Sequence, residues 1–392
     1  MDAARVAGGR GRPVAAGEAA RARSQASLGA SFAVRAAFIW PALLAILFVS
    51  IYPLLASLYI SLSHLKLVRG GFEFRFVGLD NFRELLVGGE QGNFLGVLGP
   101  LGPVGWAVMA AGVALLGWGL VRAWRGGASV AGMVFRVLGA LLAAGTLWLA
   151  TRTLLAAGGR PGTAMVTLVY VLVGITAQFL LGLGLAYLLT QGLPGQRLFR
   201  VVFLLPMMIT PVGVAYMFRM LTDTGKGPLQ PLWAAVGLSD FSWVNSPWGA
   251  RVAVMVGDIW QWTPFMFIIL LAALEAQDTD TVEAGMVDGA NRWQIFRHIT
   301  YPLLTPIIAV VMTFSVLFTF TDFQLIWAMT RGGPINATHL MATLSYQRAI
   351  IGGVLGEGSA ISNAMIPFLL AAIMVSWFGL QRRKWQQGES ND

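Results

Sequence analysis

The chain contains no cysteine. This absence excludes disulfides, thiolate catalysis and every metal site built on cysteine ligands. The three histidines, His64, His298 and His339, are scattered and lack the spacing of metal ligands, so we expect no metal site. Catalytic acids or a metal motif converging at one place are missing as well. We therefore expect that the chain is not an enzyme and has no catalytic residues.

Charged residues are scarce, at 11% of 392 residues, whereas soluble domains carry about 25%. Hydrophobic residues make up 56%, and the mean hydropathy is +0.69. So few charges cannot cover a chain of this length in water, which indicates a lipid environment. The net charge of +9 comes mostly from short basic runs between apolar segments, a pattern of membrane topology. No RNA- or DNA-binding motif occurs, so we expect no nucleic-acid partner.

A phosphate-binding loop of the Gly-x-x-x-x-Gly-Lys-Ser/Thr type is also missing. The nearest fragment, Gly225-Lys226-Gly227, lacks the upstream glycine and the hydroxyl after the lysine. We expect no cofactor in this chain, and any ATP must be used by a separate polypeptide.

Long apolar segments, by contrast, are frequent. A membrane-spanning helix needs about 20 such residues, and helices satisfy their own backbone groups in lipid. Eight segments meet or approach that length, which predicts an all-α polytopic bundle with residues 36–63, 104–121, 131–151, 164–190, 200–221, 252–274, 303–329 and 363–380 as spans. The second and third are the weakest, and their loss would leave six.

Basic residues near the spans predict the orientation. Arginines crowd the tail 1–33, and Arg382, Arg383 and Lys384 follow the last span, so we expect both termini in the cytoplasm. Four basic residues in the predicted outer loop 64–103 run against this rule. We interpret 1–33 as a disordered cytoplasmic tail, with an organelle transit peptide as the alternative.

The charged segment 275–302 separates two predicted spans and falls on the cytoplasmic side. Its first part, Thr281 to Asp288, can form a short helix with Thr281 or Asp280 as N-cap. Gly289 then permits a turn, since glycine tolerates positive φ.

A second helix is predicted to start near Asn291. It would carry Trp293, Phe296 and Ile299 on one side, and Pro302 stands where the chain re-enters the membrane. An ordinary surface loop between two spans is the simpler alternative.

This segment resembles the permease subunits of binding-protein-dependent ATP-binding-cassette importers. Their signature is Glu-Ala-Ala, three residues, Gly, nine residues, Ile, one residue and Leu-Pro. The chain keeps every spacing, with Gly285 in place of alanine and Tyr301 in place of leucine, in Glu283-Ala284-Gly285, Gly289, Ile299, Tyr301 and Pro302. Gly285 should weaken the first helix by up to about 1 kcal/mol if it is exposed.

The resemblance implies a coupling loop that docks into a groove on an ATPase subunit. Glu283 would make a polar contact, Gly289 would allow the bend, and Trp293 and Phe296 would be apolar anchors. It further implies a second permease subunit in a heterodimer, two ATPase subunits and an extracytoplasmic solute-binding protein, in a prokaryotic plasma membrane. The coupling residues are then Glu283, Ala284, Gly285, Asp288, Gly289, Trp293, Phe296, Ile299 and Pro302.

Other stretches are similar to sugar-type permeases, and the two nearest the start of the chain are similar to the first of the two non-identical subunits, as in the maltose and glycerol-phosphate importers. They are Tyr52-Pro53-Leu54, Gly78-Leu79-Asp80-Asn81-Phe82, Phe203-Leu204-Leu205-Pro206, Trp260-Gln261-Trp262-Thr263-Pro264-Phe265 and Thr330-Arg331-Gly332-Gly333-Pro334. On this basis we expect a first span with an outer loop over 36–92, a two-span insertion over 93–160, a permease core over 164–380 and a tail over 381–392.

Polar residues inside spans are costly and therefore informative. The candidate translocation pathway consists of Gln178, Asp258, Gln261, Thr319, Asp322 and Gln324. For Asp258 and Asp322, pairing with another helix or a place near the headgroups is an equal alternative. We expect the substrate to be a sugar, with glycerol-3-phosphate as the alternative. An ion-coupled secondary transporter would require clustered membrane carboxylates and an inverted repeat, and neither is evident.

Overall fold

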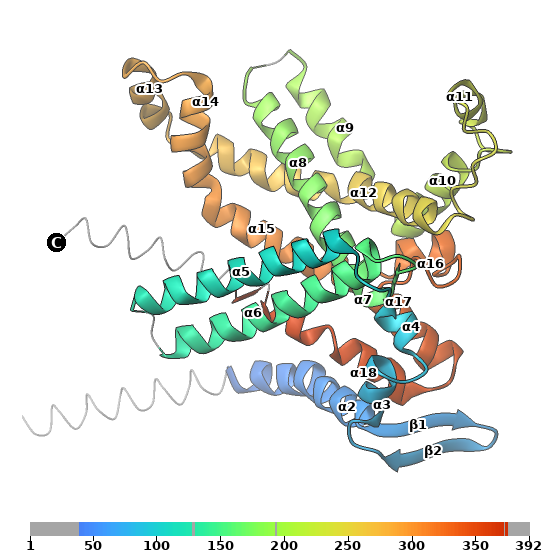
Figure 1. Cartoon of the computed structure of the whole chain (residues 1–392). Helices are drawn as coiled ribbons and strands as arrows, with labels where there is room; N and C mark the ends of the chain where they lie inside the picture. Colours follow the sequence, from blue (N-terminus) through green and yellow to red (C-terminus); the bar gives the residue numbers. More distant parts are fainter. Residues whose placement is uncertain (1–38, 128–129, 193, 372, 375–392) are drawn as a thin grey trace, which may run out of the picture. The chain divides into compact units, whose positions relative to one another are not determined.

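The computed structural model describes residues 39–127, 130–192, 194–371 and 373–374. The chain forms two units, Met1–Tyr59 and Ile60–Asp392, coloured along the sequence in Figure 1. The predicted tails 1–33 and 381–392 lie outside the described residues. The described part of the first unit is one helix that starts at Ile39, includes η1 (Leu47–Ile51) and enters α2 (Tyr52–Ser61). At 23 residues, this helix is long enough to cross a bilayer.

Five long apolar helices follow in the second unit. They are α5 (Pro103–Arg125), α6 (Val130–Ala150) with η2 (Thr151–Leu155), α7 (Thr163–Val169) with η3 (Tyr170–Gly174) and α8 (Ile175–Leu189), α12 (Pro247–Glu275), and α14 (Arg292–Ile295) with η4 (Phe296–Thr300), α15 (Tyr301–Thr321) and α16 (Gln324–Thr330). The prediction of a helical polytopic membrane chain is confirmed. The described residues contain six candidate spans, or seven if one bent pair is counted, and the predicted span 363–380 runs past them.

The segment predicted as a span at 200–221 is broken. Helices α9 (Gln196–Met208) and α10 (Pro211–Leu221) meet at an angle of 95°. The residue before a proline is biased away from helical backbone, and both Ile209 and Thr210 are extended. The Thr210 hydroxyl then accepts a hydrogen bond from the N–H of Gly213 at 3.3 Å and caps α10.

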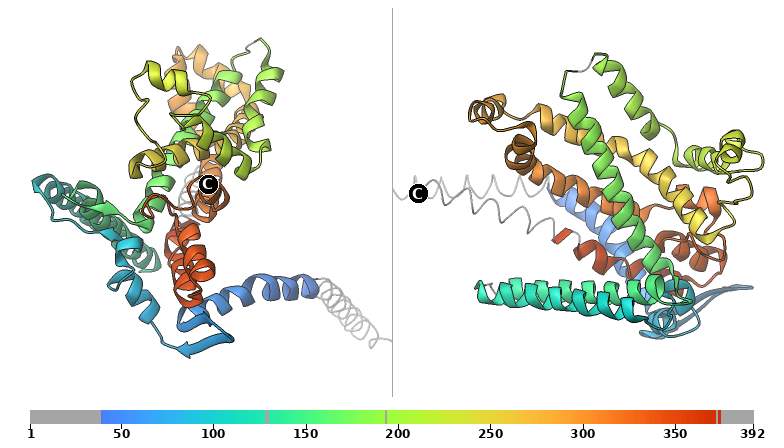
Figure 2. Two further views of the ribbon diagram at one scale, coloured as in Figure 1. Left: turned by 90° about the vertical axis from the view of Figure 1, so that its right-hand side faces the viewer. Right: turned by 45° about the horizontal axis from the view of Figure 1, so that its top comes forward.

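The core of the second unit lies where α8 crosses α12 (Figures 1 and 2). A small residue makes this approach possible, because a Cβ atom at Gly182 would lie only 2.6 Å from the Cβ of Met266. Leu183, Phe267 and Leu304 are buried around this crossing and bring α15 into the same cluster. The inner faces of these helices are thus fixed by close packing.

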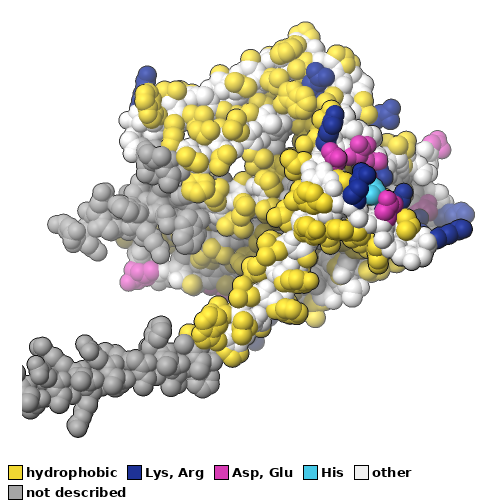
Figure 3. Space-filling view, turned by 90° about the horizontal axis from the view of Figure 1, so that it is seen from below, with side chains coloured by type: hydrophobic (Ala, Val, Ile, Leu, Met, Phe, Trp, Pro, Cys, Tyr) yellow, Lys and Arg dark blue, Asp and Glu magenta, His cyan; other side chains and the backbone are white. Residues whose placement is uncertain are grey.

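Outside this core, exposed apolar side chains are common. Hydrophobic side chains cover much of the face drawn in Figure 3, while charged side chains gather at a few places. Leu115, Leu180 and Val201 are each more than half exposed although they lie in long helices. Such surfaces are stable in lipid and costly in water.

Short elements occupy the connections, and some of them are strands that the all-α prediction did not include. They are β1 (Ser63–Val68), β2 (Gly71–Phe76), α3 (Asp80–Leu86), α4 (Gln91–Phe94), β3 (Gly96–Val97), β4 (Arg160–Pro161), α11 (Gln230–Ala235), α17 (Met341–Tyr346), η5 (Gln347–Ile351) and α18 (Leu355–Asn363). Strands β1 and β2 pair antiparallel, as do β3 and β4. The side-chain N–H groups of buried Asn81 donate to the carbonyls of Ser61 and Ser63 at 2.8 and 2.9 Å, which anchors α3 to the start of this hairpin.

The stretch after α16 closes into a tight loop. The hydroxyls of Thr330 and Thr338 lie 2.7 Å apart, and Thr338 also donates to the carbonyl of Gly333 at 2.9 Å. Nε of buried Arg251, near the start of α12, donates to the carbonyl of Ala337 at 2.7 Å. The resemblance at Thr330–Pro334 therefore falls in a loop that is tied to α12.

Candidate functional site

The predicted coupling loop contains helix α13 (Thr279–Val287), which begins earlier than the sequence suggested. The N-cap is Asp278, whose Oδ1 accepts from the N–H of Asp280 at 3.1 Å. The prediction of Thr281 or Asp280 as N-cap is wrong, because Asp278 is the first side chain in this acidic run that can accept from the helix end.

The predicted bend is present at Gly289. Its φ of +80° is a left-handed conformation that glycine adopts without strain. The N–H of Gly289 donates to the carbonyl of Met286, and that of Ala290 to the carbonyl of Gly285, both at 3.0 Å. Two carbonyls at the end of α13 are thus satisfied before the chain reverses.

The second helix starts at the predicted place with a capping box. The Asn291 side chain accepts from the N–H of Gln294 at 2.9 Å, and the Gln294 side chain accepts from the N–H of Asn291 at 2.8 Å. From Arg292 the helix continues through η4 into α15, and Pro302 lies within the first turn of α15. The loop is therefore joined rigidly to the following span.

The exposed surface of the loop differs in part from the prediction. Glu283, Ala284 and Asp288 are exposed as a docking role requires, and Trp293 is 65% exposed. Met286 and Val287, at 58% and 87% exposed, add apolar surface that sequence reasoning missed. Their exposure depends on which face of α13 turns inward, which periodicity over one short helix does not reveal.

Three predicted loop residues pack inward instead. Phe296 is half-buried, with its ring centroid 5.4 Å from that of Tyr187 on α8. Gly285 is buried, and a Cβ atom there would lie 2.8 Å from Cδ1 of half-buried Ile299. Phe296 thus makes an internal contact, and its role as an anchor stays a prediction. Gly285 lets the two loop helices approach each other. Because Gly285 is buried, the expected weakening of α13 by an exposed glycine does not apply.

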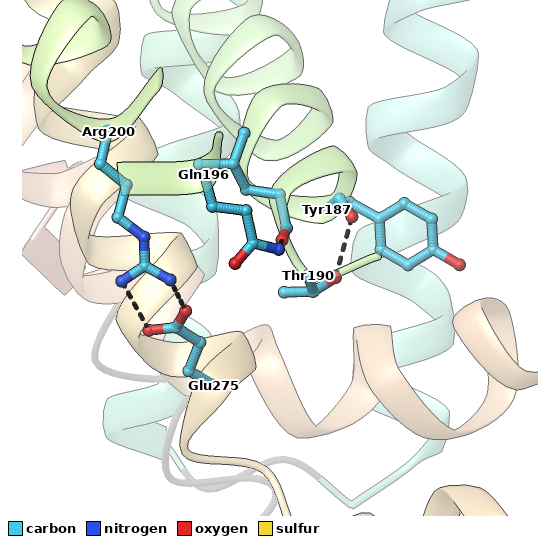
Figure 4. A network of polar contacts seen from close by, with 6 residues as sticks. Tyr187, Thr190, Gln196, Arg200 and Glu275 are labelled. Carbon is cyan, nitrogen blue, oxygen red and sulfur yellow. Dashed lines mark hydrogen bonds and ion pairs between the residues drawn. The ribbon is translucent and has the colours of Figure 1, made fainter. Parts of the chain in front are cut away.

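Polar contacts hold the base of the loop (Figure 4). Arg200 of α9 forms an ion pair with Glu275, the last residue of α12, and the side chain of Gln196 donates to the carbonyl of Leu189 at 2.6 Å. Across the loop, the side chain of Gln277 donates to the carbonyl of Thr300 at 3.2 Å. The start and end of the loop are therefore linked to each other.

The structure brings several of the predicted pathway residues together. Nε2 of Gln178 donates to Oδ2 of Asp258 at 2.9 Å, which joins α8 to α12 with both side chains buried. The carboxyl groups of Asp258 and Asp322 are near enough to interact electrostatically. Asp322 lies at the break between α15 and α16, where its backbone is extended.

Gln261 lies one turn after Asp258 on α12. Its Nε2 donates to the carbonyl of Ile209 at 3.2 Å, at the break between α9 and α10, while its buried Oε1 has no hydrogen-bond partner. Thr319 is buried one turn before Asp322, whereas Gln324 is exposed. The helix breaks at Ile209 and Asp322 thus lie near Gln261 and Asp258 of α12, and the place of Gln324 in the pathway stays a prediction.

Aromatic rings lie on the same helices, α12 and α15, as this cluster. Trp262 stacks on Phe318 with centroids 5.3 Å apart, and Phe265 meets Phe318 edge-on at 5.6 Å. A separate cavity of about 600 Å³ between α8, α9 and α12 has almost only apolar lining, with Thr263 as its one side-chain hydroxyl. Sugar recognition requires several hydrogen-bonding groups, so the polar cluster with its aromatic rings is the better candidate.

Comparison with known proteins identifies the family of this chain. The family described as binding-protein-dependent transport system inner membrane component matches residues 178–387. The chain belongs to this family. The matched residues include the coupling loop and the two helix breaks, whereas α5 and α6 precede them. The family is one of transport components rather than enzymes.

Curated relatives of the chain include a protein named probable ABC transporter permease from Sinorhizobium fredii, which is 35% identical over 53% of this chain and 66% of its own length. The trehalose/maltose transport system permease protein MalF of Thermococcus litoralis is 30% identical over 54% of this chain and 72% of its own. The trehalose transport system permease protein SugA of Mycobacterium tuberculosis is 31% identical over 55% and 68%.

Proposed function

We propose that this chain is the permease subunit of an ATP-driven sugar importer. The observation that carries the proposal is the coupling loop, which presents Glu283, Met286, Val287 and Trp293 on exposed surface and is bound rigidly to α15. The family match and the sugar permeases among the relatives support it. The partners are a second permease subunit, two ATPase subunits and an extracytoplasmic solute-binding protein, in a prokaryotic plasma membrane.

The loop acts as a lever. An ATPase subunit that closes on ATP presses on α13, and the capped turn at Gly289 passes the force to the helix that begins at Arg292. That helix is uninterrupted as far as Thr321 and ends beside Asp322, next to the polar cluster. Closure therefore shifts the pathway between two arrangements, as does any ligand that prefers one state.

The polar cluster is the proposed pathway for the sugar. Asp258, Gln261 and Asp322 offer hydrogen-bond acceptors for hydroxyl groups, and Trp262 and Phe318 offer faces for the C–H surface of a sugar ring. None of the polar side chains of this cluster is cationic, whereas recognition of a phosphate ester calls for arginine or lysine, which favours a neutral sugar over glycerol-3-phosphate.

The test is uptake by the whole transporter. The complex with its co-purifying ATPase is reconstituted in liposomes and supplied with its solute-binding protein, and ATP-dependent uptake of labelled trehalose, maltose and glycerol-3-phosphate is measured. Glu283→Lys is expected to lower uptake at least about tenfold, since a lost contact to a charged group costs about 1.5–3 kcal/mol. Asp240→Lys makes the same charge change on an exposed residue outside the loop and should leave uptake unchanged.

Two results would contradict the proposal. One is undiminished uptake by Glu283→Lys, and the other is purification of the folded chain without any ATPase. Preference for glycerol-3-phosphate over both sugars would overturn only the substrate class.

A further inference from the structure

The hairpin of α5 and α6 carries charge of one sign only. No aspartate or glutamate occurs between Glu90 and Asp223, whereas arginines stand at the tip of the hairpin, at Arg122, Arg125 and Arg136. The family match begins only at Gln178, so this charge pattern belongs to a part of the chain to which that match assigns nothing.

Two contacts define how the helices of the hairpin are aligned. The hydroxyl of Thr151 lies 3.6 Å from Sδ of Met109. A Cβ atom at Gly112 would lie 2.2 Å from Cδ2 of Leu147, so these residues also face each other. In an antiparallel pair, each step forward on α5 corresponds to one step back on α6.

This alignment brings the three tip arginines to one level. Arg136 comes opposite residues 123–124, between Arg122 and Arg125. At a rise of 1.5 Å per residue, the three arginines span only about 5 Å along the hairpin. The three arginines therefore lie close to one level of the bilayer.

The tip arginines have no carboxylate partner among the described residues. The two ion pairs in that part of the chain, Arg200–Glu275 and Arg348–Glu90, do not involve them. Arg122 and Arg125 are exposed and Arg136 is half-exposed. Three like charges without a counter-charge favour an anionic ligand.

The surroundings of the arginines are aromatic and apolar. The Arg122 guanidinium lies 5.4 Å from the ring centroid of Trp118, and Trp118 and Trp124 are 62% and 73% exposed. Trp106 and Trp148 stand at the other end of the hairpin. The 23 residues of α5 measure about 34 Å, and tryptophans at both ends mark the two interfaces of a bilayer. The arginines thus lie at headgroup level.

We propose that the α5–α6 tip binds the headgroup of an anionic phospholipid. The guanidinium groups of Arg122, Arg125 and Arg136 donate paired hydrogen bonds to the phosphate, and the acyl chains lie along exposed aliphatic side chains of α5 such as Leu115. A free phosphate would use only the cations and leave the tryptophans and apolar surface without a role. The site requires neither a particular orientation in the membrane nor the proposed import function.

Native mass spectrometry of the purified, delipidated complex tests this site. Phosphatidylglycerol or phosphatidylcholine with the same acyl chains is added, and the retained lipid is counted. Preference for phosphatidylglycerol is expected. Each arginine near the membrane surface contributes about fivefold, so Arg122→Gln/Arg125→Gln/Arg136→Gln should lose at least about tenfold of that preference.

A matched control removes three positive charges elsewhere, with Lys66→Gln/Arg69→Gln/Arg75→Gln in the β1–β2 hairpin, and should keep the preference. Should the triple tip variant fail to fold, the wild-type comparison and the single variant Arg125→Gln decide, with a partial loss expected. Equal retention of both lipids by the wild type, or full retention of phosphatidylglycerol by a folded tip variant, overturns the site. Displacement of the lipid by millimolar inorganic phosphate overturns it as well, because the ligand would then be free phosphate.

Discussion

Buried polar side chains between α8 and α12 form a hydrogen bond with each other. The amide of Gln178 faces the carboxyl group of Asp258, and the pair joins helices that are far apart in the sequence. A buried carboxyl group that loses its partner retains its desolvation penalty without compensation. This hydrogen bond should therefore contribute to stability whether or not Asp258 also contacts a substrate.

The contribution of this pair can be measured by removing the amide donor. Gln178→Leu should reduce the free energy of unfolding by about 1–3 kcal/mol, because Oδ2 of Asp258 is left without its donor. Thermal unfolding of the purified complex in detergent measures the change. The control is Thr176→Val on the same helix, where an exposed hydroxyl bonds only within its own helix. Equal unfolding temperatures for Gln178→Leu and the wild type would show that the pair does not stabilise the fold.

His339 should make stability depend on pH. Burial lowers the pKa of His339 to about 4. The folded state therefore holds the neutral ring, whereas the unfolded chain titrates near 6.5. Stability is complete above pH 6.5 and falls as the pH drops toward 4, by up to about 3 kcal/mol.

Unfolding temperatures measured from pH 4 to 8 test this dependence. His339→Gln should flatten the profile, and His298→Gln, which removes an exposed histidine, should leave it as in the wild type. A profile for His339→Gln that still matches the wild type would assign the dependence to other groups.

At the scale of elements, two glycine turns allow the effect of backbone strain to be distinguished from the effect on coupling. Gly289 and Gly192 both have left-handed backbone, with φ of +80° and +74°, and a Cβ atom at either would meet open space. A β-branched residue costs at least about 1–2 kcal/mol in that conformation. Gly289→Val and Gly192→Val should therefore be similarly destabilised.

Only Gly289→Val should uncouple ATP hydrolysis from transport, because Gly192 lies in the α8–α9 connection outside the loop. Sugar molecules imported per ATP hydrolysed in proteoliposomes give the comparison. Equal ratios for the two variants would mean that the bend at Gly289 transmits no force.

The sequence predicts the long membrane-spanning helices better than the contacts between residues far apart in the chain. Uninterrupted apolar runs predict spans at 164–190 and 252–274, and the structure has helices at Thr163–Leu189 and Pro247–Glu275, because lipid selects length and composition. Thr210 and Pro211 favour a helix break at 209–210, whereas the hydropathy of 200–221 predicts one continuous span. Apolar residues alternate along the β1–β2 hairpin, a period typical of strands, although the prediction places this segment in an outer loop.

Contacts between distant residues could not be predicted. That Gln178 meets Asp258, or that Phe296 turns toward Tyr187, depends on how whole helices cross. The coupling turn was predictable because its determinants are local, namely a left-handed glycine and a capping box within six residues of it.

For the whole molecule, the sidedness of each connection depends on whether the bent pair α9–α10 crosses the membrane. If it crosses, the connection near Gln191 and the coupling loop at Asp288 lie on the same side. If it returned to the side from which it entered, they would lie on opposite sides, since only α12 would then separate them. The Arg200–Glu275 ion pair and the contact of Phe296 with Tyr187 argue against this second placement, because they join the α8–α9 end of the helices to the coupling loop. The lever requires Asp288 on the side of the ATPase.

The absence of cysteine allows this to be measured without removing native thiols. Single substitutions Arg69→Cys, Gln191→Cys, Asp240→Cys and Asp288→Cys place a thiol on exposed residues in four connections. In intact cells, a membrane-impermeant maleimide should label positions 69 and 240, and should reach positions 191 and 288 only after permeabilisation. Labelling of 191 and 240 from the same side would make the bent pair re-entrant. Labelling of 288 in intact cells would place the loop beyond the reach of any cytoplasmic ATPase, and the proposed coupling would then be wrong.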